Sequence, residues 1–232
     1  MNALHLVRIP VRLPELMRFA RSQRIPFHDE DLGYTLHAWL VALFGAQAPK
    51  PFRFFERRSE VLGYARVTAE SLKTHAQVFA SPEAWAALEV DALASKPMPS
   101  SWHVGQRLRL EVLACPVSRK DDEEKDLFLR ALETLGAAAP ARSEVYRTWF
   151  VAQWHGVMEL EHTELRGLQA RVRMLRRAHR AEGRLRSVER PQALFSAQGV
   201  ILDGVRFSEC LARGIGRHRA FGLGMILLSP PR

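Results

Sequence analysis

The sequence predicts an α+β protein whose first half follows the order β-α-β-β-α-β, which is the order of a ferredoxin-like domain. Short runs of alternating apolar side chains are typical of strands, and longer runs with an apolar side chain every three or four residues are typical of helices. Of the 232 residues, 47% are hydrophobic and 25% are charged, which is the balance of a folded globular chain.

The first half of the chain supplies its elements in turn. Residues 4–11 alternate as a strand that Pro10 ends, and residues 13–22 are expected to form a short helix. Residues 32–44 predict a longer helix, because their leucines and Phe44 fall on one face.

The later elements of this half follow from the same patterns. Two strands are expected at 52–55 and 61–67, and a helix is expected at 69–79. The Pro-rich stretch 96–99 is expected to be a loop. Residues 108–114 alternate apolar and polar side chains and are expected to be the last strand of the domain.

A charged stretch with few apolar side chains, 118–126, is the best candidate for a boundary. The sequence therefore predicts an N-terminal domain at 1–117, a charged linker at 118–126 and a C-terminal domain at 127–232. In the last of these, Gly136 is expected to cap the first helix. The expected elements are helices at 127–135, 145–158 and 207–211, and strands at 200–202 and 225–228.

The net charge is +9, and all but five of the 34 cationic side chains are arginines. A guanidinium binds phosphate through two parallel hydrogen bonds and stacks on bases, so an arginine surplus favours a nucleic-acid partner. GC-rich coding bias would also replace lysine by arginine, and composition alone fits both explanations equally.

Nothing in the sequence indicates export or a membrane span. The longest apolar run, 38–46, is far shorter than the ~20 residues that cross a bilayer, and charged side chains interrupt the N-terminal segment. Cys115 and Cys210 are too few for a disulfide framework and lack the spacing of a zinc site. The sequence thus predicts a cytoplasmic protein with no metal, no cofactor and no membrane partner.

The stretch 214–224 combines four glycines with Arg217, His218 and Arg219. Glycine permits positive φ and close backbone approach, and exposed amides beside arginines can bind phosphates. The stretch fits neither an NTPase P-loop nor a dinucleotide-binding fingerprint. A phosphate-binding loop is therefore favoured over a packing bend.

Residues 166–190 form a second basic feature, with nine arginines against Glu182 and Glu189. The apolar side chains fit either one face of a helix or the alternation of a strand, and periodicity does not decide between the two. In either case arginines occupy one side. The positive side chains of so unbalanced a run would repel one another without a polyanion, which favours contact with RNA or DNA over a solvated face.

Tyr34 and His37 lie three residues apart in the expected helix 32–44 and share a face. A lone histidine beside a core stripe is more often structural than catalytic, so the residues alone favour a structural role. The other histidines show neither a metal-binding motif nor a cluster.

The run from Gly214 to Met225 resembles the glycine-rich loop of the CRISPR repeat-processing endoribonucleases, and of their CasE-type branch in particular. Two further stretches resemble the same branch, and all three agree with it in order and spacing over essentially the whole chain. These are Tyr34-Thr35-Leu36-His37-Ala38-Trp39-Leu40 before Phe44, and Gly105-Gln106-Arg107-Leu108-Arg109-Leu110-Glu111 before Cys115-Pro116-Val117.

The resemblance implies tandem ferredoxin-like (RRM-like) domains and metal-independent cleavage of precursor CRISPR RNA within each repeat. In that reaction a 2′-hydroxyl of the RNA attacks the adjacent phosphorus and leaves a 2′,3′-cyclic phosphate and a 5′-hydroxyl. The implied partners are the CRISPR repeat RNA with its stem-loop, the mature guide RNA and other subunits of an effector complex. The alternative is a guide-RNA-binding subunit that does not cleave.

The resemblance also implies site residues. His37, with Tyr34, is expected to be catalytic, which replaces the structural interpretation of this histidine, and its role as base or acid stays open. Residues 166–190 are longer and more basic than the corresponding region of a compact CasE-type protein, so the type of CRISPR system stays open as well. The expected RNA-binding residues are Arg166, Arg171, Arg173, Arg176, Arg177, Arg180, Gly214, Gly216, Arg217, His218, Arg219, Gly222 and Gly224.

Overall fold

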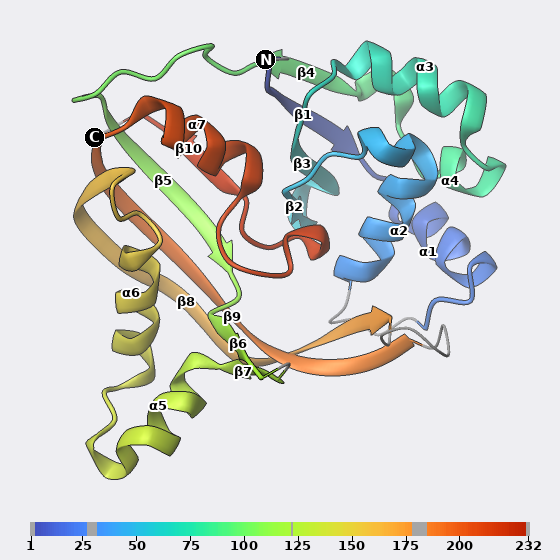
Figure 1. The fold of residues 1–232 in the computed structure, drawn as a ribbon. Coiled ribbons are helices and arrows are strands. Elements are labelled where there is room, and N and C mark those ends of the chain that lie inside the picture. Colours follow the sequence, from blue (N-terminus) through green and yellow to red (C-terminus); the bar gives the residue numbers. More distant parts are fainter. Residues whose placement is uncertain (1–2, 27–31, 122, 178–184, 231–232) are drawn as a thin grey trace. The chain divides into compact units, whose positions relative to one another are not determined.

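The computed structural model describes residues 3–26, 32–121, 123–177 and 185–230, which form two compact units (Figure 1). The first unit comprises 1–100, 173–188 and 219–222. The second unit comprises 101–172, 189–218 and 223–232. The chain therefore contributes to each unit more than once.

The first unit holds a four-stranded sheet in the order β2-β3-β1-β4. Strand β1 (His5–Pro10) pairs antiparallel with β3 (Glu60–Ala65) and β4 (Ala94–Pro97), and β2 (Phe52–Phe55) pairs antiparallel with β3. Helices connect β1 to β2 and β3 to β4, so the unit has the β-α-β-β-α-β order of a ferredoxin-like domain.

Four helices cover one face of this sheet (Figure 1). They are α1 (Leu13–Ser22), α2 (Leu32–Phe44), α3 (Ala69–Phe79) and α4 (Pro82–Ala86). Trp39 of α2 is fully buried among them, and its indole nitrogen donates a hydrogen bond of 2.9 Å to the carbonyl of Ala84. Because the buried tryptophan is both packed and hydrogen-bonded, α2 is held firmly against α4.

The second unit repeats this arrangement with a sheet in the order β10-β5-β9-β8. Its strands are β5 (Arg107–Ala114), β8 (Met158–Arg177), β9 (Leu185–Ile201) and β10 (Ile226–Ser229). Its helices are α5 (Leu127–Leu135), α6 (Arg142–Ala152) and α7 (Gly204–Arg213). β5, β8, β9 and β10 correspond to β1, β2, β3 and β4 in chain order, and each occupies the same place in its sheet as its counterpart. The shared topology confirms tandem ferredoxin-like domains.

Short 3₁₀ segments complete the chain. They are η1 (Gly45–Gln47), η2 (Glu56–Arg58), η3 (Val90–Ala92), η4 (Gly136–Ala138) and η5 (Arg219–Phe221). As expected, Gly136 caps α5, with a φ of 56°. None of the helices within the described residues is long and apolar enough to cross a membrane.

One strand was expected in the wrong sheet. β5 covers the run predicted to end the first domain, but it pairs with β9 and β10 in the second unit. The place beside β1 is taken by β4, which includes the first two residues of the loop predicted at 96–99. β4 is a short and mostly exposed edge strand, so it has no apolar alternation to reveal it. The division consequently falls after Ser100 rather than after residue 117.

The predicted linker at 118–126 is instead a hairpin of β6 (Val117–Lys120) and β7 (Glu123–Asp126). Several of its charges are paired within the second unit. Asp126 accepts a hydrogen bond of 2.8 Å from the backbone N–H of Phe128, which caps α5, and another of 2.7 Å from the hydroxyl of Tyr146. Arg142 pairs with the same carboxylate. A charged run that finds such partners can be ordered, which composition does not reveal.

Residues 166–190 are strands wherever the structure describes them. Val172 and Met174 of β8 are buried, whereas Arg171 and Arg173, which alternate with them, are exposed. This is the alternation of a strand with one buried face, and it decides between the two alternatives that periodicity left open. The expected strand 200–202 is the end of β9. The helix expected at 145–158 begins and ends earlier in the chain, as α6.

We expect the second unit to depend on an aromatic pair that joins α6 to β9. The rings of Phe150 and Phe195 stack with centroids 4.3 Å apart and planes 7° from parallel, and both side chains are fully buried. Phe150→Ala should lower the free energy of unfolding by about 3–5 kcal/mol, because it removes a buried ring and leaves a cavity. Urea unfolding measures this. Val151→Ala, on the exposed side of the same helix, is the control and should change it by less than about 0.5 kcal/mol.

Candidate functional site

The expected catalytic pair lies on α2, in the first unit. Tyr34 is 8% exposed and His37 is half-buried, and the two side chains lie on the same side of the helix. The stripe of α2 beside the pair carries Leu36, Leu40 and Leu43 into the core. The helix is therefore fixed by its apolar stripe, and the pair is held at the edge of that stripe.

Phe221 of η5 packs against both residues of the pair. Its ring lies edge-on to His37, with centroids 5.6 Å apart and planes at 84°, and it stacks on Tyr34 with centroids 6.2 Å apart. Gly33 makes this approach possible, because a Cβ at that position would lie 2.7 Å from the carbonyl oxygen of Phe221. The glycine-rich stretch thus supplies the aromatic neighbour of the histidine.

These side chains line a pocket of about 550 Å³ in the first unit. Arg176, near the end of β8, also lines the pocket. Phe19 and Gln23 of the α1 region contribute an apolar ring and an amide. The pocket therefore combines aromatic surface, an imidazole, a phenol and a permanent cation, which suits it to a flat, anionic group such as a nucleotide.

Burial lowers the pKa of His37 below its ordinary value, and the positive charge of Lys50 lowers it further. Both effects disfavour the imidazolium. At neutral pH the ring is therefore mostly the neutral imidazole, which can accept a proton.

The four glycines of the stretch 214–224 all have the positive φ that the sequence predicts. The φ angles of Gly214, Gly216, Gly222 and Gly224 are 73°, 73°, 82° and 76°. A side chain at Gly216 would also press on the ring of Trp149 at 3.2 Å. These positions require glycine for backbone conformation, and at Gly216 for packing as well.

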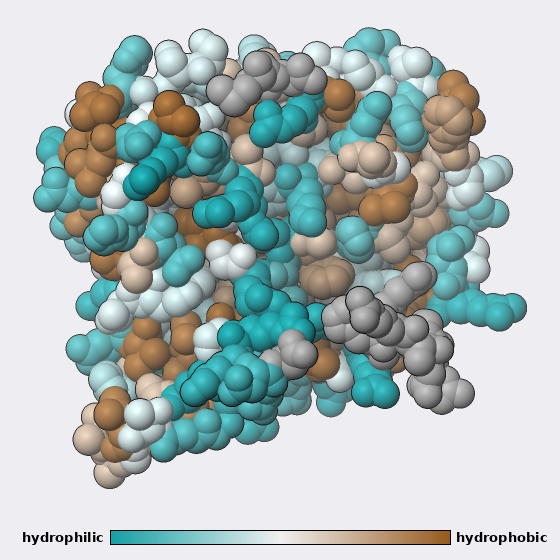
Figure 2. Space-filling view, viewed as in Figure 1, coloured by the Kyte–Doolittle hydropathy of each residue, from teal (hydrophilic) through white to brown (hydrophobic). Residues whose placement is uncertain are grey.

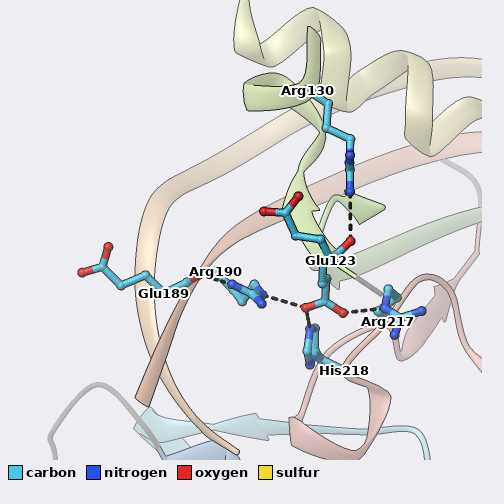
Figure 3. Close-up of polar contacts among 7 residues, drawn as sticks. Glu123, Arg130, Glu189, Arg190, Arg217 and His218 are labelled. Atoms are coloured by element: carbon cyan, nitrogen blue, oxygen red, sulfur yellow. Dashed lines mark hydrogen bonds and ion pairs between the residues drawn. The ribbon is translucent and has the colours of Figure 1, made fainter. Parts of the chain in front are cut away.

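Arg217 and His218 bind Glu124 of β7 inside the second unit (Figure 3). The Nε of Arg217 donates to one carboxylate oxygen at 2.6 Å, and Nε2 of His218 lies 2.6 Å from the other. The His218 side chain is only 6% exposed, so it anchors the loop. Arg219 opens η5 in the first unit.

The remaining predicted arginines are spread along β8. Arg166 and Arg171 are exposed and form loose ion pairs with Glu164 at 3.3 Å and Glu189 at 3.8 Å. Arg173 is exposed as well. Arg177 is the last residue of β8, and Arg180 lies outside the described residues. Figure 2 shows hydrophilic side chains gathered around the β6–β7 hairpin of the second unit.

Sequence reasoning missed Phe221 and Gly33, which lie at the pocket of the first unit, and Glu124, which binds the glycine-rich stretch in the second unit. Phe221 carried a signal, because it is the one aromatic side chain in the glycine-rich stretch. Glu124 carried none, since it is one of several acids in a run that resembles a solvated linker. Among the described residues, no group of three or more His, Cys, Asp or Glu side chains is placed to hold a metal ion.

Solved structures with the same fold come from CRISPR systems. The CRISPR endoribonuclease Cse3 bound to a 19-nt RNA matches with a TM-score of 0.64 and 17% identity, over 98% of this chain and 100% of that chain. Cas6e from Escherichia coli K-12 matches with a TM-score of 0.56 and 16% identity, over 98% and 100%. A chain of a CRISPR RNA-guided surveillance complex matches with a TM-score of 0.53 and 18% identity, over 98% and 100%.

No curated protein matches the chain by sequence. At these identities the solved structures establish the fold, and the family comes from a match of the sequence itself. The family described as CRISPR associated protein matches residues 4–230, which is nearly the whole chain. The two ferredoxin-like units, the glycine-rich stretch and this match agree, and the chain belongs to the family of CRISPR associated proteins.

Proposed function

We propose that the chain is a metal-independent endoribonuclease that cleaves precursor CRISPR RNA within the repeat and stays bound to the mature guide RNA. The observation that carries this proposal is the pocket in which Phe221 packs against His37 and Tyr34, with Arg176 in its wall. Solved proteins of the same fold support it, because they are described as endoribonucleases bound to RNA or as parts of an RNA-guided surveillance complex.

The residues of the pocket suit transfer of a phosphoryl group within the RNA. Neutral His37 takes the proton of the 2′-hydroxyl as its oxygen forms a bond to the adjacent phosphorus. The bond from phosphorus to the 5′-oxygen breaks, and that oxygen takes up a proton from the hydroxyl of Tyr34. Arg176 stabilises the negative charge of the pentacoordinate phosphorus. The products are a 2′,3′-cyclic phosphate and a 5′-hydroxyl.

A guide-RNA-binding subunit that does not cleave is the second candidate. The resemblance in fold to a chain of a surveillance complex favours it, because that chain works within an assembly with guide RNA. Retention of the product would unite both functions in one protein. We place the chain in the cytoplasm, where precursor RNA is made.

The test of the enzymatic function is a single-turnover cleavage assay in EDTA on RNA carrying the CRISPR repeat of the genome that encodes the chain. We expect cleavage to persist without divalent ions and to leave a cyclic phosphate. His37→Ala should slow it by about 10²-fold or more, the usual effect of removing a general base, while RNA affinity changes little. His103→Ala, at an exposed position of the second unit, is the control. Cleavage at the wild-type rate by His37→Ala would exclude this histidine from the mechanism.

The pKa of His37 should respond to Phe221. Burial is the main cause of the lowered pKa, and Phe221→Ala removes the ring that covers one edge of the imidazole. We expect the pKa to rise toward 6.5 and the cleavage rate to fall at neutral pH, because less of the ring is neutral. NMR titration of the His37 ring proton measures the pKa. Phe79→Ala removes an exposed ring from α3 and should leave it unchanged.

The exposed arginines of β8 should contribute affinity for RNA. Replacing Arg171 and Arg173 with Ala should weaken binding, and should reduce the slope of log K against log salt by about 0.7–0.9 for each phosphate that is no longer neutralised. Arg57→Ala with Arg58→Ala removes the same charge from η2 of the first unit and is the control. Equal salt slopes for the two double variants would show that the strand arginines form a solvated face.

A further inference from the structure

Glu124 is a buried acid that the proposed reaction does not use. Its side chain is 5% exposed, although its immediate neighbours on β7 carry partly or fully exposed charges. Three basic side chains surround its carboxylate in the second unit (Figure 3). They come from two places in the chain, since Arg190 lies on β9 whereas Arg217 and His218 lie in the glycine-rich stretch.

Each of these interactions has the length of a charge-assisted hydrogen bond. The Nε of Arg190 and Nε2 of His218 both lie 2.6 Å from Oε1, and the Nε of Arg217 lies 2.6 Å from Oε2. Burial by itself raises the pKa of the Glu124 carboxyl, but the hydrogen bonds from His218, Arg190 and Arg217 outweigh it and hold the pKa well below the usual range. The carboxylate is thus charged whenever the unit is folded at neutral pH.

The glycine-rich stretch needs such an anchor. Gly214 and Gly216 both have a φ of 73°, and His218 has a φ of 60°, which is rare for a residue with a side chain. Glycine adds conformational freedom to an unrestrained loop, and a left-handed histidine persists only where its surroundings hold it. Glu124 provides that restraint for His218 directly.

Arg217 differs from the other two partners in its exposure. Its side chain is 39% exposed, against 17% for Arg190 and 6% for His218. The bond to Glu124 uses Nε, which leaves the two terminal nitrogens of the guanidinium for a further acceptor. A guanidinium held in this way is already oriented before a phosphate arrives, so less side-chain entropy is lost on binding.

We propose that Glu124 is a positioning residue for RNA binding, whose buried carboxylate holds the glycine-rich stretch through His218 and presents the guanidinium of Arg217 to a phosphate of the RNA. This inference rests on the proposed function in that it takes RNA as the ligand. It assigns to an acidic residue the role of strengthening the binding of an anion. Removing this negative charge should therefore lower the affinity for RNA, which is the opposite of a simple electrostatic effect.

Glu124→Gln and Glu123→Gln form a matched pair for the test. Both remove one negative charge from β7, but the Glu123 carboxylate points away from the cluster in Figure 3. A purely electrostatic effect would make both variants bind repeat RNA slightly more tightly. We expect Glu123→Gln to do so, and Glu124→Gln to bind about threefold to tenfold more weakly, because coupling between neighbouring side chains is commonly of that size. Fluorescence anisotropy with labelled repeat RNA measures both.

A double-mutant cycle identifies Arg217 as the group through which Glu124 acts. Glu124→Gln should weaken binding in the wild-type background and change it by less than about twofold in an Arg217→Ala background. Cleavage at saturating RNA should stay near the wild-type rate in Glu124→Gln, since the residue affects binding rather than the reacting atoms. Affinity of Glu124→Gln equal to or above that of Glu123→Gln overturns the proposal, as does full additivity with Arg217→Ala.

Hydrogen exchange of the free protein separates this proposal from the proposed function. Peptides covering 214–218 should exchange faster in Glu124→Gln than in Glu123→Gln, whether or not the chain binds RNA. If the wild-type chain neither binds nor cleaves repeat RNA, the proposed function is wrong. If, in addition, peptides covering 214–218 exchange equally fast in Glu124→Gln and Glu123→Gln, Glu124 does not anchor the glycine-rich stretch either. Should Glu124→Gln not fold, Glu124→Asp takes its place with the same expectations. Its shorter side chain cannot reach all three partners, and wild-type affinity and exchange for it would contradict the proposal.

Discussion

The positive φ angles of the glycine-rich stretch are the constraint on which both the His37 pocket and the cluster around Glu124 depend. Four glycines allow the chain to leave α7, form η5 and reach β10 within a few residues. In doing so the stretch supplies Phe221 to the first unit and Arg217 with His218 to the second. Substituting a residue with a side chain at these glycines would strain the backbone at the points where the path turns.

Internal pairing changes what the basic composition means. The net charge of +9 invites the view that arginines face an external polyanion. In the structure, Arg190 and His218 are instead largely buried against Glu124, and Arg142 pairs with Asp126. The exposed arginines of β8 and the partly exposed Arg217 are among the groups whose charge is available for a ligand. Burying a charge is costly unless it is paired, so the pairing is as much a requirement of the fold as a functional device.

The environment of His37 shows how packing prepares a side chain for chemistry. An exposed histidine on a helix would be partly protonated near neutral pH, whereas the ring packed beside Phe221 and influenced by Lys50 has a lowered pKa. The same packing restrains the ring in one orientation. Both effects follow from neighbours distant in sequence, and both suit a group that accepts a proton.

The sequence by itself determined the local structure. Residues 13–22, 32–44, 69–79 and 127–135 are helices with the expected limits, because apolar periodicity and caps act within a few residues. It also indicated the positive φ of the four glycines in the glycine-rich stretch, and that Tyr34 and His37 share a face of their helix. The tertiary structure decided which strands pair, so that β5 belongs to the second sheet and the short β4 completes the first. It decided as well that Glu124 is buried and that Phe221 reaches His37. Such pairings depend on interactions between residues far apart in the chain, where many partners satisfy the same local pattern and only packing of the whole selects among them.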